Sequence, residues 1–457
     1  MKPIRNFLVA AAALSLSACS FEVSNPGPLP DDVLDANGAY SAIVLGVRYN
    51  LSRAQSVNAY YSAVAAKEYS TAGRVISTKL PSVLGQLTVD DISANMYNWS
   101  QAARWQAEDG VRRLRDVLGT GFNTNPVAAR LLMFVALTNR VLGENFCEAV
   151  IDGGVKEANS VYFDRAETAA NEAIAVATAI GASADSTRFA ALAVRATARL
   201  YKGNFAGAAA DAALVANTFS LSAPYDETIQ NIIVQANDFA VGGSFRATSV
   251  WRSFFDNYYR TTGDQRVWWD STFTATGAVA VGEITTVRWY FPRKYIPTRT
   301  TTDRGQPIKL ISGREMRLIQ AEVFLRAGDF ASAAPLINGL RTGVAVRTGS
   351  AALSPWTITN VREGWNALRK ERSIELWLEA RTMGDLRRWI ADGTYKSQFD
   401  ITPAGTGING SPDNVADRIR LCFPISRGER NTNANLSLTP DDPTSSLYVA
   451  GGAAAVW

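Results

Sequence analysis

The chain has 457 residues, a formal net charge of +4 and no histidine. A nearly neutral chain of this length gives no support to nucleic-acid binding, which needs a concentrated basic surface. The missing imidazole excludes Ser-His-Asp and Cys-His catalysis and histidine metal ligands. No phosphate-binding glycine-rich loop or dinucleotide fingerprint is present, so we expect neither a metal nor a cofactor.

The N-terminus predicts export. Residues 1–18 combine a basic start, MKPIR, with the run FLVAAAALSL, which is too short to span a bilayer. The sequence LSAC that ends at Cys19 resembles a bacterial lipobox, in which the cysteine is acylated after cleavage; the alternative is an ordinary signal peptide with a chance cysteine. An acylated Cys19 would anchor the chain to a membrane, and Ser20 in place of Asp favours the outer membrane. We therefore expect a lipid-anchored outer-membrane protein, on either the cell-surface or the periplasmic face of that membrane.

The mature chain divides into a short linker and one long folded body. Cleavage before Cys19 removes Lys2 and Arg5, which lowers the formal net charge to +2. Residues 19–30 are rich in Pro, Ser, Gly and Asn and are typical of a tether. Residues 31–457 exceed the roughly 250–300 residues that one compact core holds. This length predicts several domains or an extended helical array, and the second, as a single body, is the organisation that we expect.

Helical patterns dominate the first half of this body. Residues 31–118 are mainly helical in pattern, with an interruption at STKLPSVLGQLTVDD, and Pro126 begins a further helix that ends at Gly143. ARLYKGNFAGAAADAAL (198–214) is echoed by EVFLRAGDFASAAPLIN (322–338), each with a turn glycine, an aromatic residue and paired alanines. Both segments resemble the helical hairpin of tetratricopeptide repeats. Tetratricopeptide-like helices are therefore predicted over about 126–222 and 309–392.

An insert over about 224–307 separates the two helical regions. Aromatic and β-branched residues become frequent there, as in TSVWRSFFDNYY and DQRVWWDSTF, which favours short strands or irregular loops over helices. The C-terminal segment 393–457 is loop-rich, with LCFPIS as its apolar part. The predicted fold class is mainly α, with an irregular, short-strand insert.

Two cysteines remain once Cys19 carries lipid. Cys147 and Cys422 form an even pair in an oxidising compartment, which suggests one disulfide across a very long loop. Two buried free thiols are the alternative, because sequence does not bring the two residues within bonding distance.

The densest cluster of charges lies in ERSIELWLEARTMGDLRRW, residues 371–389. On one continuous helix, Glu371, Glu375 and Glu379 would form a stripe of like charge that repels itself. The apolar residues between them predict a partly buried helix, and buried carboxylates must be paired.

We expect arginines of a neighbouring helix to neutralise this stripe, with Arg314, Arg317 and Arg326 as candidates. Asp385 lies between Arg381 and Arg388, which should serve it within its own helix. An active site is the alternative to this structural network. The structural interpretation is favoured because ion-pair networks also gather charged residues.

The same stretch resembles the signature of SusD/RagB-type outer-membrane nutrient-binding lipoproteins, ER-x-x-EL-x-x-E-x-R-x-x-DL-x-R-W. The matching residues are Glu371, Arg372, Glu375, Leu376, Glu379, Arg381, Asp385, Leu386, Arg388 and Trp389. Residues 308–343 are similar to the family's helix with a Gly-Asp-aromatic turn, and FPISRGERNTNANL is similar to its closing segment. Residues 30–225 match only loosely.

The resemblance implies a SusD-like α-helical fold with tetratricopeptide-like hairpins. It also implies a binding protein without catalysis, which caps a TonB-dependent, SusC-like transporter barrel and delivers an oligosaccharide or a peptide to it. Two alternatives stay open. One is a glycoside hydrolase, which needs only two carboxylates; the other is a repeat-type scaffold that binds a protein.

Exposed aromatic rings are the expected ligand contacts, because sugar rings stack on them. The candidates are Tyr97, Trp99, Trp251, Tyr258, Tyr259, Trp268 and Trp269. The alternative for each ring is a place in the core. The adjacent pair Trp268 and Trp269 is the most suggestive, since an alternating strand cannot bury both.

Overall fold

A computed structural model of the chain describes residues 34–35, 39–66, 68–73, 91–225, 246–251, 253–272, 281–282, 287–298, 303, 305–391 and 422–437. The signal peptide, Cys19 and the linker lie outside the described residues, as do the whole segment 393–421 and residues 438–457.

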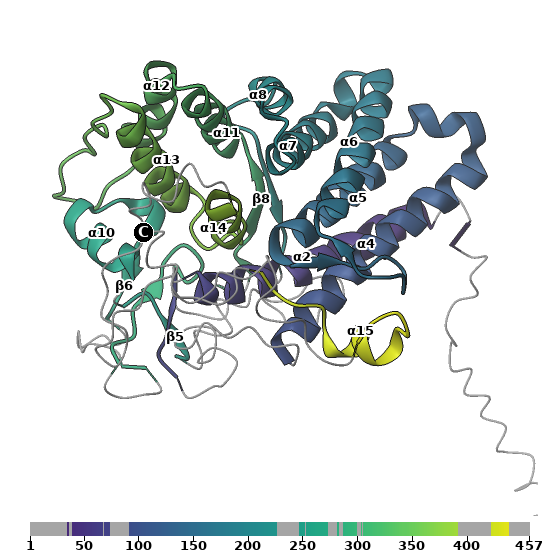
Figure 1. Cartoon of the computed structure of the whole chain (residues 1–457), viewed down its shortest axis with the longest axis horizontal. Coiled ribbons are helices and arrows are strands. Elements are labelled where there is room, and N and C mark those ends of the chain that lie inside the picture. The colour runs from purple at the N-terminus through teal and green to yellow at the C-terminus, as the bar shows by residue number, and fades with distance from the viewer. Residues whose placement is uncertain are drawn as a thin grey trace, which may run out of the picture.

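The described part is mainly helical, as the sequence predicts (Figure 1). The α-helices are α2 (Tyr40–Ala65), α4 (Asp91–Leu118), α5 (Pro126–Asn145), α6 (Ser160–Ile180), α7 (Asp185–Tyr201), α8 (Phe205–Ala213), α10 (Phe254–Thr262), α11 (Gly313–Arg326), α12 (Phe330–Arg341), α13 (Val361–Glu375), α14 (Thr382–Ala391) and α15 (Arg427–Thr432). Short 3₁₀ turns are η3 (Gly119–Thr124), η4 (Ala182–Ala184) and η5 (Gln265–Val267).

The strands form small antiparallel pairs between distant parts of the chain. These are β1 (Ser70–Thr71) with β5 (Thr248–Ser249), β2 (Glu148–Ala149) with β3 (Glu157–Ala158), β4 (Ser220–Ala223) with β8 (Ile308–Ser312), and β6 (Trp269–Asp270) with β7 (Phe291–Pro292). The β4–β8 pair joins the two ends of the insert, so the polypeptide leaves the helical region and returns to it at nearly the same place.

The two hairpins that echo each other in sequence have the same construction. Gly203 and Gly328 adopt φ of +77° and +79°, the left-handed conformation that glycine favours. Asn204 then caps α8 by accepting from the Gly207 N–H at 3.0 Å, and Asp329 caps α12 by accepting from the Ser332 N–H at 2.9 Å. The tetratricopeptide-like hairpins are therefore confirmed, and packing of α8 on α11 brings the two copies side by side (Figure 1).

Helix α5 runs through the centre of the helical region. Asn125 caps it and Pro126 occupies its first turn, as predicted. Its length and hydropathy would suffice to cross a membrane, but 83% of its most apolar window is buried inside the fold, as in the core helix of a globular protein.

One piece of the insert departs from the prediction. The sequence FFDNYYRTT forms helix α10, not a strand or loop. Phe255, Tyr258 and Tyr259 are buried together at helical spacing, so burial of one face overrides the β-propensity of the aromatic residues. The short pairs β5, β6 and β7 agree with the rest of the predicted insert.

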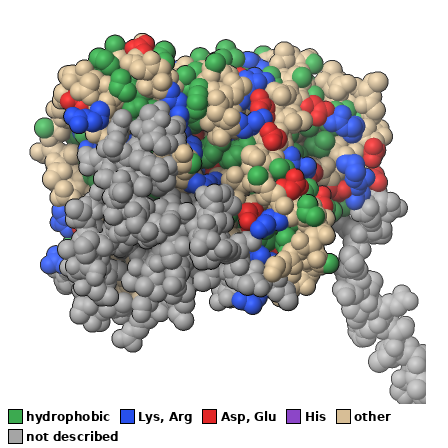
Figure 2. All heavy atoms as spheres, viewed as in Figure 1, with side chains coloured by type: hydrophobic (Ala, Val, Ile, Leu, Met, Phe, Trp, Pro, Cys, Tyr) green, Lys and Arg blue, Asp and Glu red, His purple; other side chains and the backbone are tan. Residues whose placement is uncertain are grey.

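Side chains of both signs are intermixed on the described part of the face in Figure 2. Beneath the surface, a large apolar cluster includes residues of α2, α5, α6 and α7, and a second cluster includes residues of α11, α12, α13 and α14. Ile374 and Trp377 belong to the first cluster, whereas Leu386 and Trp389 belong to the second. The charged stretch 371–389 therefore lies where the two clusters meet.

Cys147 and Cys422 form a disulfide with their Cα atoms 5.0 Å apart. It stands beside the Cys147 N–H to Phe423 carbonyl hydrogen bond of 3.0 Å, which ties the C-terminal segment to the end of α5.

The bond closes a loop with a sequence separation of 275, so its loss should cost stability by freeing the unfolded chain. We expect Cys147→Ala/Cys422→Ala to lower the free energy of unfolding by about 2–4 kcal/mol in urea titrations. Reduction should lower the stability of the parent protein and leave the double variant unchanged. Equal stability of the two proteins without reductant, or free thiols at both positions by peptide mapping, would contradict the assignment.

Candidate ligand-binding site

The charged stretch is not one continuous helix. Helix α13 ends at Glu375 and α14 begins at Thr382, and Leu378 and Ala380 between them adopt φ of +60° and +64°. Glu379 lies in this turn, so the predicted three-residue stripe is wrong. Side chains from elsewhere bind the backbone of the turn, which stabilises it in place of helical hydrogen bonds.

Three such contacts hold the turn. The Leu378 N–H donates to the Glu68 carboxylate at 2.7 Å. The Lys294 ammonium donates to the Trp377 carbonyl at 2.6 Å, and the Gln55 amide donates to the Glu379 carbonyl at 3.2 Å. Partners from α2, from its C-terminal flank and from the insert thus meet at this turn.

Each carboxylate of the stretch has a cationic partner. Arg314 forms a two-pronged pair with Glu375, with Nε 2.7 Å from Oε1 and Nη2 2.8 Å from Oε2. Arg266 of the insert also donates to Glu375, at 3.1 Å. Burial alone would raise the pKa of Glu375, but these two guanidiniums lower it below its ordinary value. Arg314 is thus confirmed as a partner.

The other two predicted partners are wrong. Arg317 donates to the carbonyls of Ala212 and Val215 near the end of α8, and Arg326 pairs with Glu322 at 3.0 Å within its own helix. Among the described residues, neither guanidinium pairs with a carboxylate of 371–379.

Cations of the insert take their place. Arg266 donates to Glu371, which also accepts from the Trp356 indole at 2.9 Å. Lys294 pairs with Glu379 at 2.7 Å.

The second half of the stretch is paired across helices. Asp385 accepts from Arg388 at 2.9 Å, as expected, but its other partner is Arg372 at 2.5 Å and not Arg381. Arg381 instead reaches the Glu144 carboxylate at the end of α5. This longer-range pair is possible because the turn before α14 redirects Arg381 away from Asp385.

Two carboxylates of α11 complete the network. Glu315 accepts from Arg140 of α5 at 2.7 Å, and Glu322 accepts from Arg388 at 2.7 Å. Burial would raise the pKa of Glu322, but Arg388 and Arg326 lower it to about 2. Both α11 carboxylates therefore have lowered pKa values and are ionised at neutral pH, and they are buried as well as paired.

The aromatic residues of the insert divide by burial. Trp269 stacks on Tyr290 with ring centroids 4.2 Å apart, and Tyr259 meets Trp269 edge-on. The Tyr258 hydroxyl donates to Asp264 at 2.9 Å and accepts from Arg341 at 2.7 Å. Tyr258, Tyr259 and Trp269 are core residues, which leaves no ring face for a ligand.

Trp251 and Trp268 are only half-buried. The Arg293 guanidinium lies 4.7 Å from the centre of the Trp268 ring, on one of its faces. The adjacent tryptophans therefore separate, with Trp269 in the core and Trp268 at its edge.

The N-terminal candidates divide in the same way. Tyr97 is buried, and its hydroxyl accepts from Gln101 at 2.9 Å. Trp99 is half-buried and lies under the Arg53 guanidinium, 3.9 Å from the ring centre. Arg53 also approaches Tyr49, at 5.3 Å, so α2 and α4 together present one cation and two rings.

Sequence reasoning missed the cations of this region: Arg53, Arg266, Arg293 and Lys294. Partners for 371–389 were sought only on helices, whereas Arg266 and Lys294 lie in the insert. The available sequence signal was the closeness of Arg266 to Trp268 and the presence of Arg293 and Lys294 within the aromatic run RWYFPRKY.

The chain is similar in sequence and in structure to known proteins. Residues 235–441 match the model of the family described as the SusD family. A SusD superfamily protein from Parabacteroides distasonis has a similar structure, with a TM-score of 0.65, 12% identity, and coverage of 89% of this chain and 98% of that one. A SusD superfamily protein from Bacteroides vulgatus is also similar in structure, with a TM-score of 0.63 and 15% identity. The comparison covers 89% of this chain and 98% of that chain.

A structure described as a laminarin binding SusD-like protein is also similar, with a TM-score of 0.59 and 16% identity, over 85% of this chain and 98% of that chain. No curated protein sequence matches the chain. The predicted SusD-like fold is thereby confirmed.

Glu379→Ala should lower stability, because it leaves the mostly buried Lys294 ammonium without its counter-charge. We expect the free energy of unfolding to fall by about 3 kcal/mol in urea titrations. Glu172→Ala is the matched control, since Glu172 pairs with Arg115 at the surface and its removal should cost less than about 1 kcal/mol. Equal effects of the two substitutions would contradict a structural role for Glu379.

Glu68 should make stability depend on pH. Burial raises its pKa from 4.5 to about 7, despite hydrogen bonds from Thr382 and Leu378 and the nearby Lys294 charge; Glu379 raises it further. The folded state then binds a proton that the unfolded state has lost, so stability falls as pH rises from about 4.5 to 7. The expected contribution is about 3 kcal/mol.

Glu68→Gln should remove this fall, because the amide cannot ionise and keeps an acceptor for the Leu378 N–H. Urea titrations between pH 4.5 and 8 measure the free energy of unfolding of the variant and of the parent. The change with pH in the difference between them is the contribution of Glu68. A difference that stays constant over that range would show that Glu68 does not titrate there.

Proposed function

Because this chain belongs to the SusD/RagB family, we propose that it is a lipid-anchored outer-membrane protein that binds a nutrient glycan and delivers it to a TonB-dependent, SusC-like transporter. The match of the family model to residues 235–441 carries this proposal. The laminarin binding relative supports a glycan as the ligand, with a peptide as the alternative. Acylation of Cys19 would supply the anchor; that residue lies outside the described part of the chain.

The ligand site is proposed around the half-buried tryptophans Trp99, Trp251 and Trp268. A sugar ring stacks on an aromatic face through its C–H groups, and an arginine beside that face donates to hydroxyl oxygens. Trp99 with Arg53 and Trp268 with Arg293 each provide this combination. The arginine covers one face of each indole, so the opposite face is the one proposed for stacking.

Catalysis by the signature carboxylates is disfavoured by their surroundings. A glycosidase acid must reach the glycosidic oxygen and hold a proton at neutral pH. The side chains of Glu371, Glu375 and Glu379 are at most 2% exposed, and each has a cationic partner. Binding without cleavage is therefore proposed over the hydrolase.

Purified protein should bind a glycan from a panel that includes laminarin oligosaccharides and release no shorter product. In calorimetry, Trp268→Ala and Trp99→Ala should each weaken binding roughly tenfold, because each removes a stacking face. Trp105→Ala is the matched control, since Trp105 is 56% exposed on α4 and lies outside the proposed site.

Three outcomes would contradict parts of the proposal. Product release would favour the hydrolase. A TonB-dependent barrel recovered with the protein, but no affinity for glycan or peptide, would favour the scaffold. Unchanged binding in both tryptophan variants would place the ligand elsewhere on the protein.

A further inference from the structure

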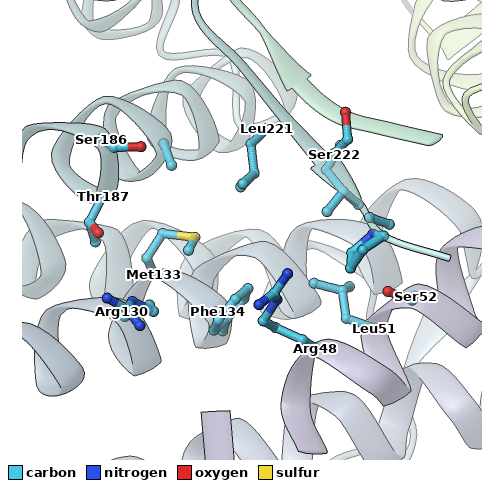
Figure 3. A pocket seen from close by; sticks show the side chains of 14 residues that line it. Arg48, Leu51, Ser52, Arg130, Met133, Phe134, Ser186, Thr187, Leu221 and Ser222 are labelled. Carbon is cyan, nitrogen blue, oxygen red and sulfur yellow. The ribbon is translucent and has the colours of Figure 1, made fainter. Parts of the chain in front are cut away.

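A pocket of about 220 Å³ opens among α2, α5, α7 and strand β4 (Figure 3). None of the aromatic candidates discussed above lines it. Its walls combine an apolar surface with a cationic and hydroxyl-bearing one, and a small molecule that fills it must satisfy both.

The apolar wall comes from three elements. Leu51 lies on α2, Met133 and Phe134 on α5, and Leu221 on β4. An apolar cavity of about 150 Å³ in another protein holds a benzene molecule. The present volume therefore suits a body of that size with one further polar group.

Two arginines supply the positive charge. Arg48 of α2 and Arg130 of α5 both line the pocket (Figure 3). Both side chains are exposed, and neither forms an ion pair within the described residues. No Asp or Glu is among the residues that line the pocket. An anion is the species that this lining would attract.

The first turn of α7 adds to this preference. Ser186 and Thr187 line the pocket from the second and third positions of that 17-residue helix, whose N-cap residue Ala184 makes no side-chain cap. The neighbouring Asp185 is paired with Arg188 at 2.7 Å, so its charge is balanced.

An unpartnered buried hydroxyl provides an independent sign of a ligand. Ser52 lines the pocket and is 1% exposed, and its Oγ has no hydrogen-bond partner among the residues that the structure describes. A buried polar group normally has such a partner. Rotation about χ1 would let this hydroxyl donate to an oxygen of a bound molecule.

We propose that this pocket binds a small carboxylate with an apolar body, of the size of benzoate or hexanoate. The carboxylate lies between Arg48 and Arg130, near the start of α7. The apolar body contacts Leu51, Phe134 and Leu221. The site is additional to the glycan site and does not depend on it.

Calorimetry with benzoate and hexanoate tests the proposal, with benzamide and hexanamide as neutral counterparts of the same shape. The acids should bind and the amides should not, and added NaCl should weaken binding through screening. Arg48→Gln and Arg130→Gln should each weaken binding roughly fivefold. Arg362→Gln, the same charge change at an exposed site outside the pocket, should leave it unchanged.

Circular dichroism of each variant verifies that it is folded before its affinity is interpreted. Equal binding of acids and amides, or unchanged affinity in both arginine variants, would overturn the proposal. Binding of glucuronate or a uronate-terminated oligosaccharide, without binding of the apolar acids, would overturn the assigned ligand class. Arg130→Gln should leave glycan binding unchanged. A failure of the pocket proposal can therefore be distinguished from a failure of the glycan-binding proposal.

Discussion

The structure depends on burying a large number of charges and pairing them. Arg140 and Glu144 on α5, Glu315 and Glu322 on α11, and Arg372, Arg381, Asp385 and Arg388 in the stretch 371–389 are all buried or nearly so. Removing a charge from water costs several kcal/mol even after relaxation, so each ion is tolerable only with its partner in place. The ion pairs therefore restrict how α5, α11, α13 and α14 can be arranged.

This constraint extends to the proposed ligand region. Arg266 pairs with Asp264, Glu371 and Glu375, and Lys294 pairs with Glu379, so the insert is attached to the signature stretch by charge. The same two cations are close in sequence to Trp268 and Arg293. Among the described residues of the insert, the strand pairs are two residues long and supply few backbone hydrogen bonds. Its aromatic residues are positioned by these ion pairs and by their packing against the core.

Local patterns in the sequence predicted local structure well. The turn glycines, their Asn and Asp caps, and Pro126 at the start of α5 fix the backbone within a few residues, so the hairpins could be recognised. The partners of 371–389 could not, because they depend on which distant segments meet. Periodicity gave no sign of the left-handed residues Leu378 and Ala380, and spacing on an assumed helix misplaced Glu379.

The candidate site shows the same limit. Aromatic composition located the region, yet Tyr258 and Trp269 are core residues while Trp268 is only half-buried. Whether a ring faces solvent depends on which side of the local backbone meets the core. At the start of β6, successive side chains alternate between the two sides of the backbone, so Trp269 faces the core and Trp268 does not. For the same reason, the sequence did not identify Arg53 and Arg293 as candidate site residues, because their role depends on which rings they cover.

In a chain without histidine, two kinds of arginine stand out, and the contrast between them indicates where ligands bind. Arginines such as Arg140, Arg314, Arg372 and Arg381 use their guanidiniums on buried carboxylates and hold the helices together. Within the described residues, Arg48, Arg53 and Arg130 have no carboxylate partner. Arg53 lies on aromatic rings, and Arg48 and Arg130 line the pocket. A guanidinium cannot lose its charge at physiological pH, so an unpaired one beside a ring or a cavity is available to an external acceptor. The anion pocket is thus inferred from two such cations, and Arg53 beside Trp99 adds one to the proposed glycan contacts.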